Sequence, residues 1–280
     1  MNLYQDIKPL QSHLQAKRRQ NLRIGFVPTM GALHAGHLSL IDAAKEKCDI
    51  VACSIFVNPT QFNNLLDLEL YPRNIENDIR LLVQSGCYIL FHPTIEEMYG
   101  SDFHKDSAAV YGPYINLLEG AHRPGHFDGV ITIVKRLFEI IEPDEVFFGQ
   151  KDYQQCLVIK TLLERNFTNI VFNRCAIKRE TDGLAMSSRN VKLNKEERIA
   201  ASLLIQALNH IKANWNAETW ETSIAEAKKM IAHNKHLQLE YLCVTDPDNL
   251  TELSAFNMNA IALIAAYCGQ TRLIDNLLLN

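Results

Sequence analysis

Short apolar runs alternate with amphipathic stretches along the first two thirds of this 280-residue sequence. The apolar runs are rich in β-branched residues and occupy 23–28, 49–57, 87–93, 145–149 and 169–176. The stretches between them, such as 37–47, 74–86 and 127–141, repeat apolar residues at spacings of three and four, which is typical of helices. Strands that alternate with helices predict right-handed crossovers and a mostly parallel sheet covered on both faces. The fold class that we expect is therefore α/β, a doubly wound parallel sheet of the Rossmann-like kind.

The pattern changes near residue 184. Two helical segments, 195–215 and 221–234, precede three apolar runs at 237–246, 260–269 and 271–279 that have no helices between them. This order predicts a second, smaller α+β domain. No repeat or low-complexity linker marks the boundary, so the change of pattern alone sets it. We expect a larger Rossmann-like domain over 1–183 and a small C-terminal lid domain over 184–280.

The composition argues against nucleic-acid and membrane partners. The net charge is −4 and the one basic cluster is short, at 17–19, whereas binding to a phosphate backbone relies on clustered Lys and Arg. No window approaches 18 continuous apolar residues, and the N-terminus lacks a signal-peptide pattern. The seven cysteines are scattered without a CxxC pair, which fits reduced thiols. We expect a cytoplasmic protein without a metal site built from its own side chains.

The first polar motif follows the run 23–28, and in an open α/β sheet ligands bind beyond the carboxyl ends of the strands. A tight turn at 29–31 leads to a helix that begins near Gly36, so backbone amides and the positive helix end favour an anion. His34 and His37 lie close to one helix face and add imidazole donors. Two other interpretations remain: a pair of helix-capping histidines, or two zinc ligands, for which a third ligand is lacking nearby.

The second motif is FVNPTQF, residues 56–62, after the second strand. Asn58 and Gln61 are neutral amides, which suit the hydroxyl and carboxylate groups of a small polar ligand. Ordinary turn chemistry at Asn-Pro is the alternative interpretation.

The third motif is FFGQKDYQQ, residues 147–155. Gly149 ends an apolar strand, and Lys151 and Asp152 stand at the turn that follows. An ammonium group can meet phosphate oxygens there, and a carboxylate can accept from ribose hydroxyls. Asp152 as a simple helix cap is the alternative.

The fourth motif is KRETDGLAMSSRN, residues 178–190, at the expected domain junction. Ser187, Ser188 and Arg189 place two hydroxyls and a guanidinium on one loop, which suits a triphosphate. An ordinary loop would have a similar composition, but four such clusters at strand ends together favour a nucleotide site.

The stretches PTMGALHAGHLSL, FVNPTQF, RPGHFDGV, FFGQKDYQQ and DGLAMSSRN, in this order over essentially the whole chain, resemble the motifs of the pantothenate synthetase family. Its members are ATP-dependent ligases that join pantoate to β-alanine. The H-x-G-H stretch and the MSSR loop also resemble the two signatures of the wider nucleotidyltransferase superfamily, which includes class I aminoacyl-tRNA synthetases. The resemblance implies a pantoyl-adenylate intermediate, release of AMP and pyrophosphate, a role in coenzyme A biosynthesis, a requirement for Mg²⁺, and a homodimer.

The resemblance also implies roles for individual residues. ATP would be bound by Met30, Gly31, Ala32, Leu33, His34, Ala35, Gly36, His37, Gly149, Gln150, Lys151, Asp152, Lys178, Met186, Ser187, Ser188 and Arg189. His34, His37, Lys151 and Arg189 would be catalytic, with His37 the acid at the phosphates. Gln61 and Gln155 would hold pantoate, and Gln61 would also border the β-alanine site. Asn58 would be a further residue of this substrate site. Arg123 and His126 belong to the family motif RPGHF, with only a loose assignment. Lys178 and Leu66 depart from the family pattern, which usually has a small or aliphatic residue and an acidic residue at these positions.

Two other functions remain compatible with the motifs. One is a nucleotidyltransferase that stops at an adenylated product. The other is a catalytically silent nucleotide- or RNA-binding module, which the acidic balance and the intact basic side chains of the motifs disfavour.

Overall fold

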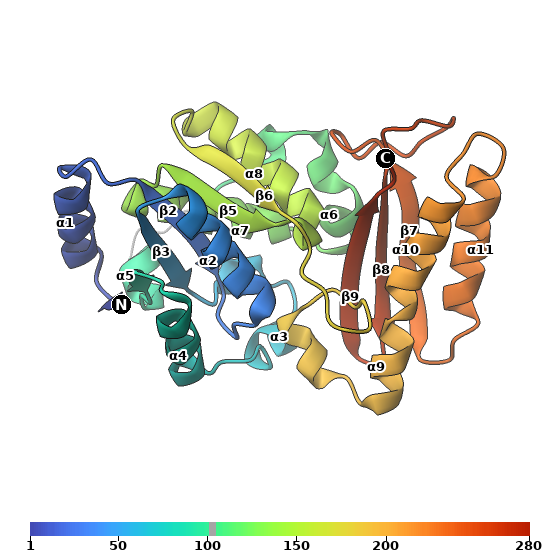
Figure 1. The fold of residues 1–280 in the computed structure, drawn as a ribbon, viewed down its shortest axis with the longest axis horizontal. Coiled ribbons are helices and arrows are strands. Elements are labelled where there is room, and N and C mark those ends of the chain that lie inside the picture. Colours follow the sequence, from blue (N-terminus) through green and yellow to red (C-terminus); the bar gives the residue numbers. More distant parts are fainter. Residues whose placement is uncertain (101–104) are drawn as a thin grey trace. The chain divides into compact units, whose positions relative to one another are not determined.

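The structure is a computed structural model that describes residues 1–100 and 105–280 (Figure 1). Its internal contacts divide it into two units. The N-terminal unit comprises residues 1–149 and 154–176, and the C-terminal unit comprises 150–153 and 177–280.

A six-stranded sheet forms the centre of the N-terminal unit (Figure 1). Its strands are β1 (Asn2–Tyr4), β2 (Ile24–Thr29), β3 (Ile50–Ile55), β4 (Ile89–Phe91), β5 (Glu145–Gly149) and β6 (Val171–Cys175). Their order is β1-β4-β3-β2-β5-β6, and every neighbouring pair is parallel. The predicted doubly wound α/β fold is confirmed. The edge strand β1 was not predicted, because three residues are too short for a periodic pattern.

Helices cover both faces of this sheet. Val27 packs with α2 and α4, whereas its neighbour Phe26 meets Phe138 of α7 edge to face at 6.4 Å between ring centroids. Burial on both faces explains why β2 and β3 are apolar almost throughout. The helices of the unit are α1 (Ile7–Arg18), α2 (Ala35–Lys47), α3 (Leu65–Glu69), α4 (Ile75–Ser85), α5 (Ile95–Tyr99), α6 (Leu118–His122), α7 (His126–Ile141) and α8 (Tyr153–Asn166), with 3₁₀ turns η1 (Pro59–Gln61), η2 (Ala108–Tyr111) and η3 (Pro113–Asn116). Within 1–100 and 105–280, no helix has both the length and the apolarity needed to cross a membrane.

The strand order reverses at β2. From β2 the chain continues to β3 and β4 on one side, whereas β5 and β6 extend the sheet on the other. Ligands of open α/β sheets bind beyond the carboxyl ends of the strands at such a reversal. The residues that follow β2 and the end of β5 at Gly149 therefore lie at the position where a ligand is expected.

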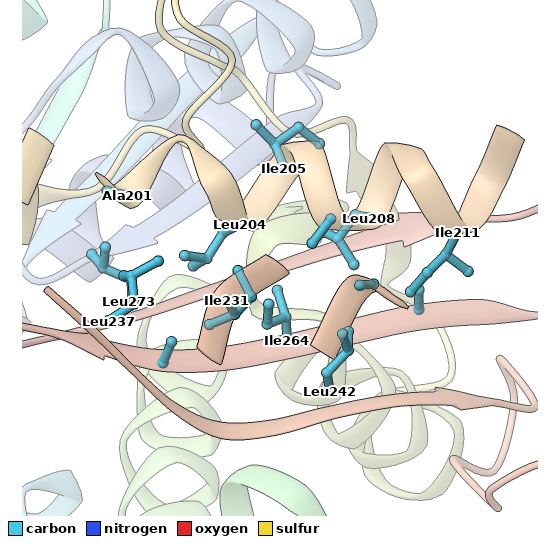
Figure 2. Packing of buried hydrophobic residues seen from close by; sticks show 14 of the residues in the cluster. Ala201, Leu204, Ile205, Leu208, Ile211, Ile231, Leu237, Leu242, Ile264 and Leu273 are labelled. Atoms are coloured by element: carbon cyan, nitrogen blue, oxygen red, sulfur yellow. The ribbon is translucent and has the colours of Figure 1, made fainter. Parts of the chain in front are cut away.

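The C-terminal unit is a smaller α+β domain, as predicted. Its antiparallel sheet has the order β7 (Leu237–Thr245), β8 (Ile261–Cys268) and β9 (Thr271–Leu278). Its helices are α9 (Lys195–Ala201), α10 (Leu203–Ala213) and α11 (Trp220–Ala232), and its 3₁₀ turns are η4 (Gln150–Asp152) and η5 (Ser188–Lys192). Figure 2 shows α10 side chains such as Leu204 and Leu208 packed over the sheet with Ile264 and Ile231.

The first helical segment of this unit differs from the prediction. A single helix was expected over 195–215, but α9 ends at Ala201 and α10 starts at Leu203. Ser202 lies between them, and its hydroxyl donates to the carbonyl of Ile199 at 2.8 Å. Serine hydroxyls compete with the helical hydrogen bonds in this way, which explains the interruption.

Candidate active site

The turn after β2 is held by a buried carboxylate. Gly31 and Ala32 have φ values of +78° and +51°, which a residue with a Cβ rarely adopts. Asp78 of α4 is 1% exposed, and its two carboxylate oxygens accept the N–H groups of Ala32 and Leu33, each at 2.8 Å. Two of the backbone amides that we expected to face an anion are therefore used by Asp78. Sequence reasoning missed Asp78, because it lies 46 residues away along the chain on a different helix.

His34 and His37 cap the start of α2. His34 is the N-cap residue, and its Nδ1 accepts the N–H of Gly36 at 3.1 Å. In return, Nδ1 of His37 accepts the N–H of His34 at 3.4 Å, and the two rings lie 4.1 Å apart. The capping interpretation is thus realised in the structure. It is compatible with phosphate binding, because an acceptor Nδ1 fixes the tautomer in which Nε2 carries the proton and is the donor.

Gln61 lies next to this turn. Its side-chain nitrogen donates to Sδ of Met30 at 3.0 Å, and its side-chain oxygen accepts from Nδ2 of Asn58 at 3.1 Å. Asn58 is 1% exposed and also donates to the carbonyl of Gly129 at 3.0 Å, while its oxygen accepts from Thr60 and Tyr99. Asn58 therefore orients Gln61 through contacts within the protein. Burial raises the pKa of the Tyr99 hydroxyl to about 12, so that it remains a donor.

The segment with Gln61 packs directly against α7. A Cβ at Gly129 would lie 2.4 Å from the carbonyl oxygen of Thr60, so only glycine permits this approach. Nδ1 of His126 donates to the carbonyl of Gln61 at 2.8 Å, and Nε2 of His126 accepts from Arg123 at 3.2 Å. Arg123 and His126 thus support the backbone of Gln61, a role that the motif RPGHF alone does not reveal.

Two adjacent glutamines on α8 have different environments. Gln154 is 3% exposed, and its amide nitrogen donates to the carbonyls of Tyr114 and Leu117 at 2.7 and 2.9 Å. Gln155 is partly exposed. Gln154 is therefore structural, whereas Gln155 is accessible to a ligand.

In the C-terminal unit, the segment Gln150–Asp152 lies against β9. Asn276 donates its side-chain N–H groups to the carbonyls of Gln150 and Lys151 at 2.9 and 3.0 Å. The Lys151 ammonium lies 3.5 Å from Oδ1 of Asp152, which is half exposed. Lys151 therefore has a fixed backbone and a side chain with a carboxylate neighbour.

The loop 178–190 begins as a hairpin. Met186 donates its N–H to the carbonyl of Lys178 at 3.0 Å, while the Lys178 side chain is exposed. Ser187 is the N-cap of η5, and its hydroxyl accepts the N–H of Arg189 at 3.2 Å. The backbone role of Lys178 is independent of its side chain, so its departure from the family pattern leaves the hairpin intact.

The candidate residues therefore form two groups. One lies in the N-terminal unit and consists of the turn with its two histidines, the amides Asn58 and Gln61, and, on β5 and α8, Gly149 and Gln155. The other lies in the C-terminal unit and consists of 150–152, Lys178 and 186–189. Leu66, the other departure, is an exposed residue of α3. In the ranges 1–100 and 105–280, no three His, Cys, Asp or Glu side chains are grouped so as to hold a metal ion.

Comparison with curated proteins gives close similarity over the full length. The chain is 40% identical to pantothenate synthetase from Porphyromonas gingivalis over 281 residues, which cover 99% of each chain. It is 43% identical to pantothenate synthetase from a Thermoanaerobacter species over 274 residues, which cover 97% of this chain and 96% of the relative.

Solved structures agree with the sequences. Pantothenate synthetase from Thermus thermophilus superposes with a TM-score of 0.91 at 36% identity and covers 100% of this chain and 99% of its own. Pantoate-beta-alanine ligase from Francisella tularensis, complexed with beta-gamma ATP and beta-alanine, has a TM-score of 0.81 at 34% identity and covers 100% and 98%. The family model described as pantoate-beta-alanine ligase matches residues 2–278. The chain therefore belongs to the pantoate-beta-alanine ligase family, whose members are ligase enzymes.

Proposed function

We propose that this enzyme joins pantoate and β-alanine in two steps through pantoyl adenylate, with ATP as the activating substrate. The Francisella relative, crystallised with an ATP compound and β-alanine, supports these substrates. The observation that carries the proposal is the group of residues that follows the carboxyl ends of β2 and β3: a strained turn, two imidazoles and a neutral amide. The imidazoles of His34 and His37 suit phosphates, and Gln61 suits a hydroxy acid.

In the first step, a carboxylate oxygen of pantoate attacks the α-phosphorus of ATP. The bond from that phosphorus to the bridging oxygen of the β-phosphate breaks, and pyrophosphate leaves with the electron pair. Negative charge grows on the leaving oxygens, so positioned donors supply most of the catalysis. The Nε2–H groups of His34 and His37 are such donors, because each Nδ1 is occupied as an acceptor. Lys151 and Arg189 are the cationic residues that we assign to the same phosphates.

In the second step, the amine of β-alanine attacks the acyl carbon, and AMP leaves as the carbon–oxygen bond breaks. The amine loses one proton during this step. We assign no side chain as its base, and water or a phosphate oxygen can accept the proton.

An adenylate route needs no nucleophile from the enzyme, and the cysteines agree with this. Burial raises the pKa of Cys48 and Cys268 to about 11, and that of Cys87 and Cys243 to about 12. Thiols with such pKa values hold almost no thiolate at neutral pH, and the thiolate is the nucleophile. A thioester intermediate is therefore disfavoured at these positions.

Mg²⁺ is the expected companion of ATP. It commonly keeps several waters and takes one or two carboxylates together with substrate phosphates, so we expect the triphosphate to provide most of its oxygen ligands. When bound, it neutralises charge on the phosphates.

We also propose that the enzyme is a homodimer in the cytoplasm. Sedimentation of the purified protein would test the dimer, and its distribution on cell fractionation would test the compartment.

The two other functions receive less support. A nucleotidyltransferase that stops at an adenylated product, or a silent nucleotide-binding module, would need neither pantoate nor β-alanine. The family match over 2–278 covers the chain from the first strand to the last and favours the complete ligase reaction.

Isotope exchange tests the order of the steps. With pantoate, ATP and Mg²⁺ but no β-alanine, the enzyme should exchange labelled pyrophosphate into ATP and retain about one adenylate per active site. With β-alanine but no pantoate, it should do neither. Exchange that requires β-alanine, or formation of ADP and phosphate, would replace this mechanism with an acyl-phosphate route.

A further inference from the structure

Two neighbouring residues of β9, Asp275 and Asn276, are buried polar residues that the proposed reaction does not use. They are 2% and 1% exposed. Successive residues of a strand point to opposite faces of the sheet, so the two side chains address different sides of β9. Buried polar groups of this kind carry fixed partners, and their partners indicate their role.

Asn276 binds the segment that carries Lys151. Its side-chain nitrogen donates to the carbonyls of Gln150 and Lys151, and its side-chain oxygen accepts from Nε2 of Gln150 at 3.2 Å. All of these bonds end on 150–151, so they fix the backbone from which the Lys151 side chain extends. Asn276 lies 125 residues away from Lys151 in sequence, so this support arises only once the chain has folded.

Asp275 binds the start of the loop 178–190, the loop that carries Arg189. Its carboxylate accepts two hydrogen bonds from the guanidinium of Arg179, at 2.7 and 3.0 Å, and such bidentate pairs have a strongly defined geometry. Arg179 also donates to the carbonyl of Gly183 at 3.0 Å and pairs with Ala185 in an isolated β-bridge. The hairpin that leads into Ser187 and Arg189 is therefore fixed to Asp275, the residue of β9 next to Asn276.

We propose that Asp275 and Asn276 are positioning residues that hold the Lys151 segment and the hairpin before Arg189 as one rigid piece of the C-terminal unit. This inference rests on the proposed function, in which both segments bind the triphosphate. The contact of β9 with both η4 and η5 supports it. The two cations would then reach ATP together, because neither segment moves without β9.

Asn276→Asp tests the part that concerns Lys151. The variant keeps the shape of the side chain but replaces the donor amide by a carboxylate that faces two carbonyl oxygens. Hydrogen exchange of the amides in 150–153 should accelerate about tenfold or more, whereas exchange in β8 should stay within about twofold. This measurement uses no substrate, so its result is independent of the proposed reaction.

Kinetics then show whether the support serves catalysis. Asn276→Asp should lower kcat by about 10- to 100-fold, because displacing a charged group by about 1 Å costs that much, and should leave KM for β-alanine unchanged. In a Lys151→Ala background, the same substitution should cost less than about threefold, because residues that act as a unit are not additive.

Asn214→Asp is the matched control. Asn214 donates its side-chain N–H to the carbonyl of His210 at the end of α10, and within 1–100 and 105–280 its hydrogen bonds involve only residues of 210–219, not those of the two segments. The Asn214→Asp variant should leave hydrogen exchange in 150–153 and kcat unchanged.

If Asn276→Asp does not fold, Asn276→Ser, which adds no charge, serves the same tests. Normal exchange in 150–153, kcat within about twofold of wild type, or an equal loss with and without Lys151 would overturn the proposal. Accelerated hydrogen exchange of 150–153 in Asn276→Asp, together with no exchange of pyrophosphate into ATP by the wild-type enzyme, would instead refute the proposed function and leave the positioning role standing.

Discussion

The carboxylate of Asp78 holds Ala32 in a left-handed backbone conformation by accepting its N–H at 2.8 Å. A non-glycine residue in this region costs about 1–2 kcal/mol and persists only where its surroundings fix it. Asp78 provides that fixation from inside the protein, since it is 1% exposed. Asp78 therefore positions the start of α2, with its two histidines, through the backbone of Ala32 and Leu33.

Asp78→Asn should weaken both stability and ATP use. An asparagine offers one oxygen, so it cannot accept from Ala32 and Leu33 with two separate oxygens, and one buried N–H loses its partner at a cost of about 1–3 kcal/mol. We expect that loss in denaturant unfolding and a rise in KM for ATP of about tenfold. Asp42→Asn, in which the replaced carboxylate is 64% exposed, is the control and should change neither quantity. Unchanged ATP kinetics in Asp78→Asn would show that the turn has no role in ATP binding.

Ala32→Gly should be neutral or stabilising, unlike most glycine substitutions. Glycine costs about 0.5–1 kcal/mol through the unfolded chain, but it removes the left-handed strain at φ +51°. Ala43→Gly, in the interior of α2, has no such strain to remove and should lose about 1 kcal/mol. Free energies of unfolding of the two variants, measured together, test this difference. A loss at position 32 as large as that at 43 would contradict it.

The sequence predicts the elements of this protein better than it predicts their contacts. The runs at 24–29 and 50–55 are apolar because the sheet is covered on both faces, so periodicity and composition identify them. The turn at 29–31 and the amides at 58 and 61 were found from local residue types. Each of these signals extends over fewer than ten residues.

The supporting residues could not be found in that way. Asp78, His126 and Asn276 act on backbone atoms 45 to 126 residues away, and only the folded chain brings them together. One signal was nevertheless available. Asp275 follows Leu273 on the same face of an apolar strand, and a buried charge on such a face requires a partner. That partner is Arg179.

Adjacent glutamines on α8 provide a test of the pantoate assignment. Gln154→Ala removes two hydrogen bonds to buried carbonyls and should lower stability by about 1–3 kcal/mol, with little effect on KM for pantoate. Gln155→Ala should do the opposite and raise KM for pantoate by about tenfold without a change in unfolding. Steady-state kinetics and denaturant unfolding of both variants distinguish the roles. Normal pantoate kinetics in Gln155→Ala would remove Gln155 from the substrate site.

Acid should destabilise the N-terminal unit partly through His13. Burial, with a smaller contribution from Lys17, lowers the pKa of His13, whose Nδ1 lies 2.5 Å from the Tyr4 hydroxyl. The unfolded chain therefore binds the proton more tightly, so this contribution is present above the ordinary pKa of about 6.5 and is lost as the pH falls below it. His13→Gln cannot titrate, and its unfolding free energy should fall less than that of wild type between about pH 7 and pH 5. Parallel curves for the two proteins would contradict this.

His37→Gln separates the two roles of His37. Glutamine at this position of a capping box can still accept the N–H of His34, so the start of α2 should keep its stability within about 0.5 kcal/mol. It cannot supply an imidazole N–H to a leaving phosphate, so kcat should fall by about a hundredfold with a smaller change in KM for ATP. His37→Ala should show the same fall in kcat and also lose about 1 kcal/mol of stability with the cap. Glu197→Ala removes the corresponding residue of the capping box at α9 and should reduce stability alone. Unfolding curves and single-turnover rates of the three variants distinguish these outcomes, and near-normal turnover in His37→Gln would leave His37 as a helix cap without a part in the chemistry.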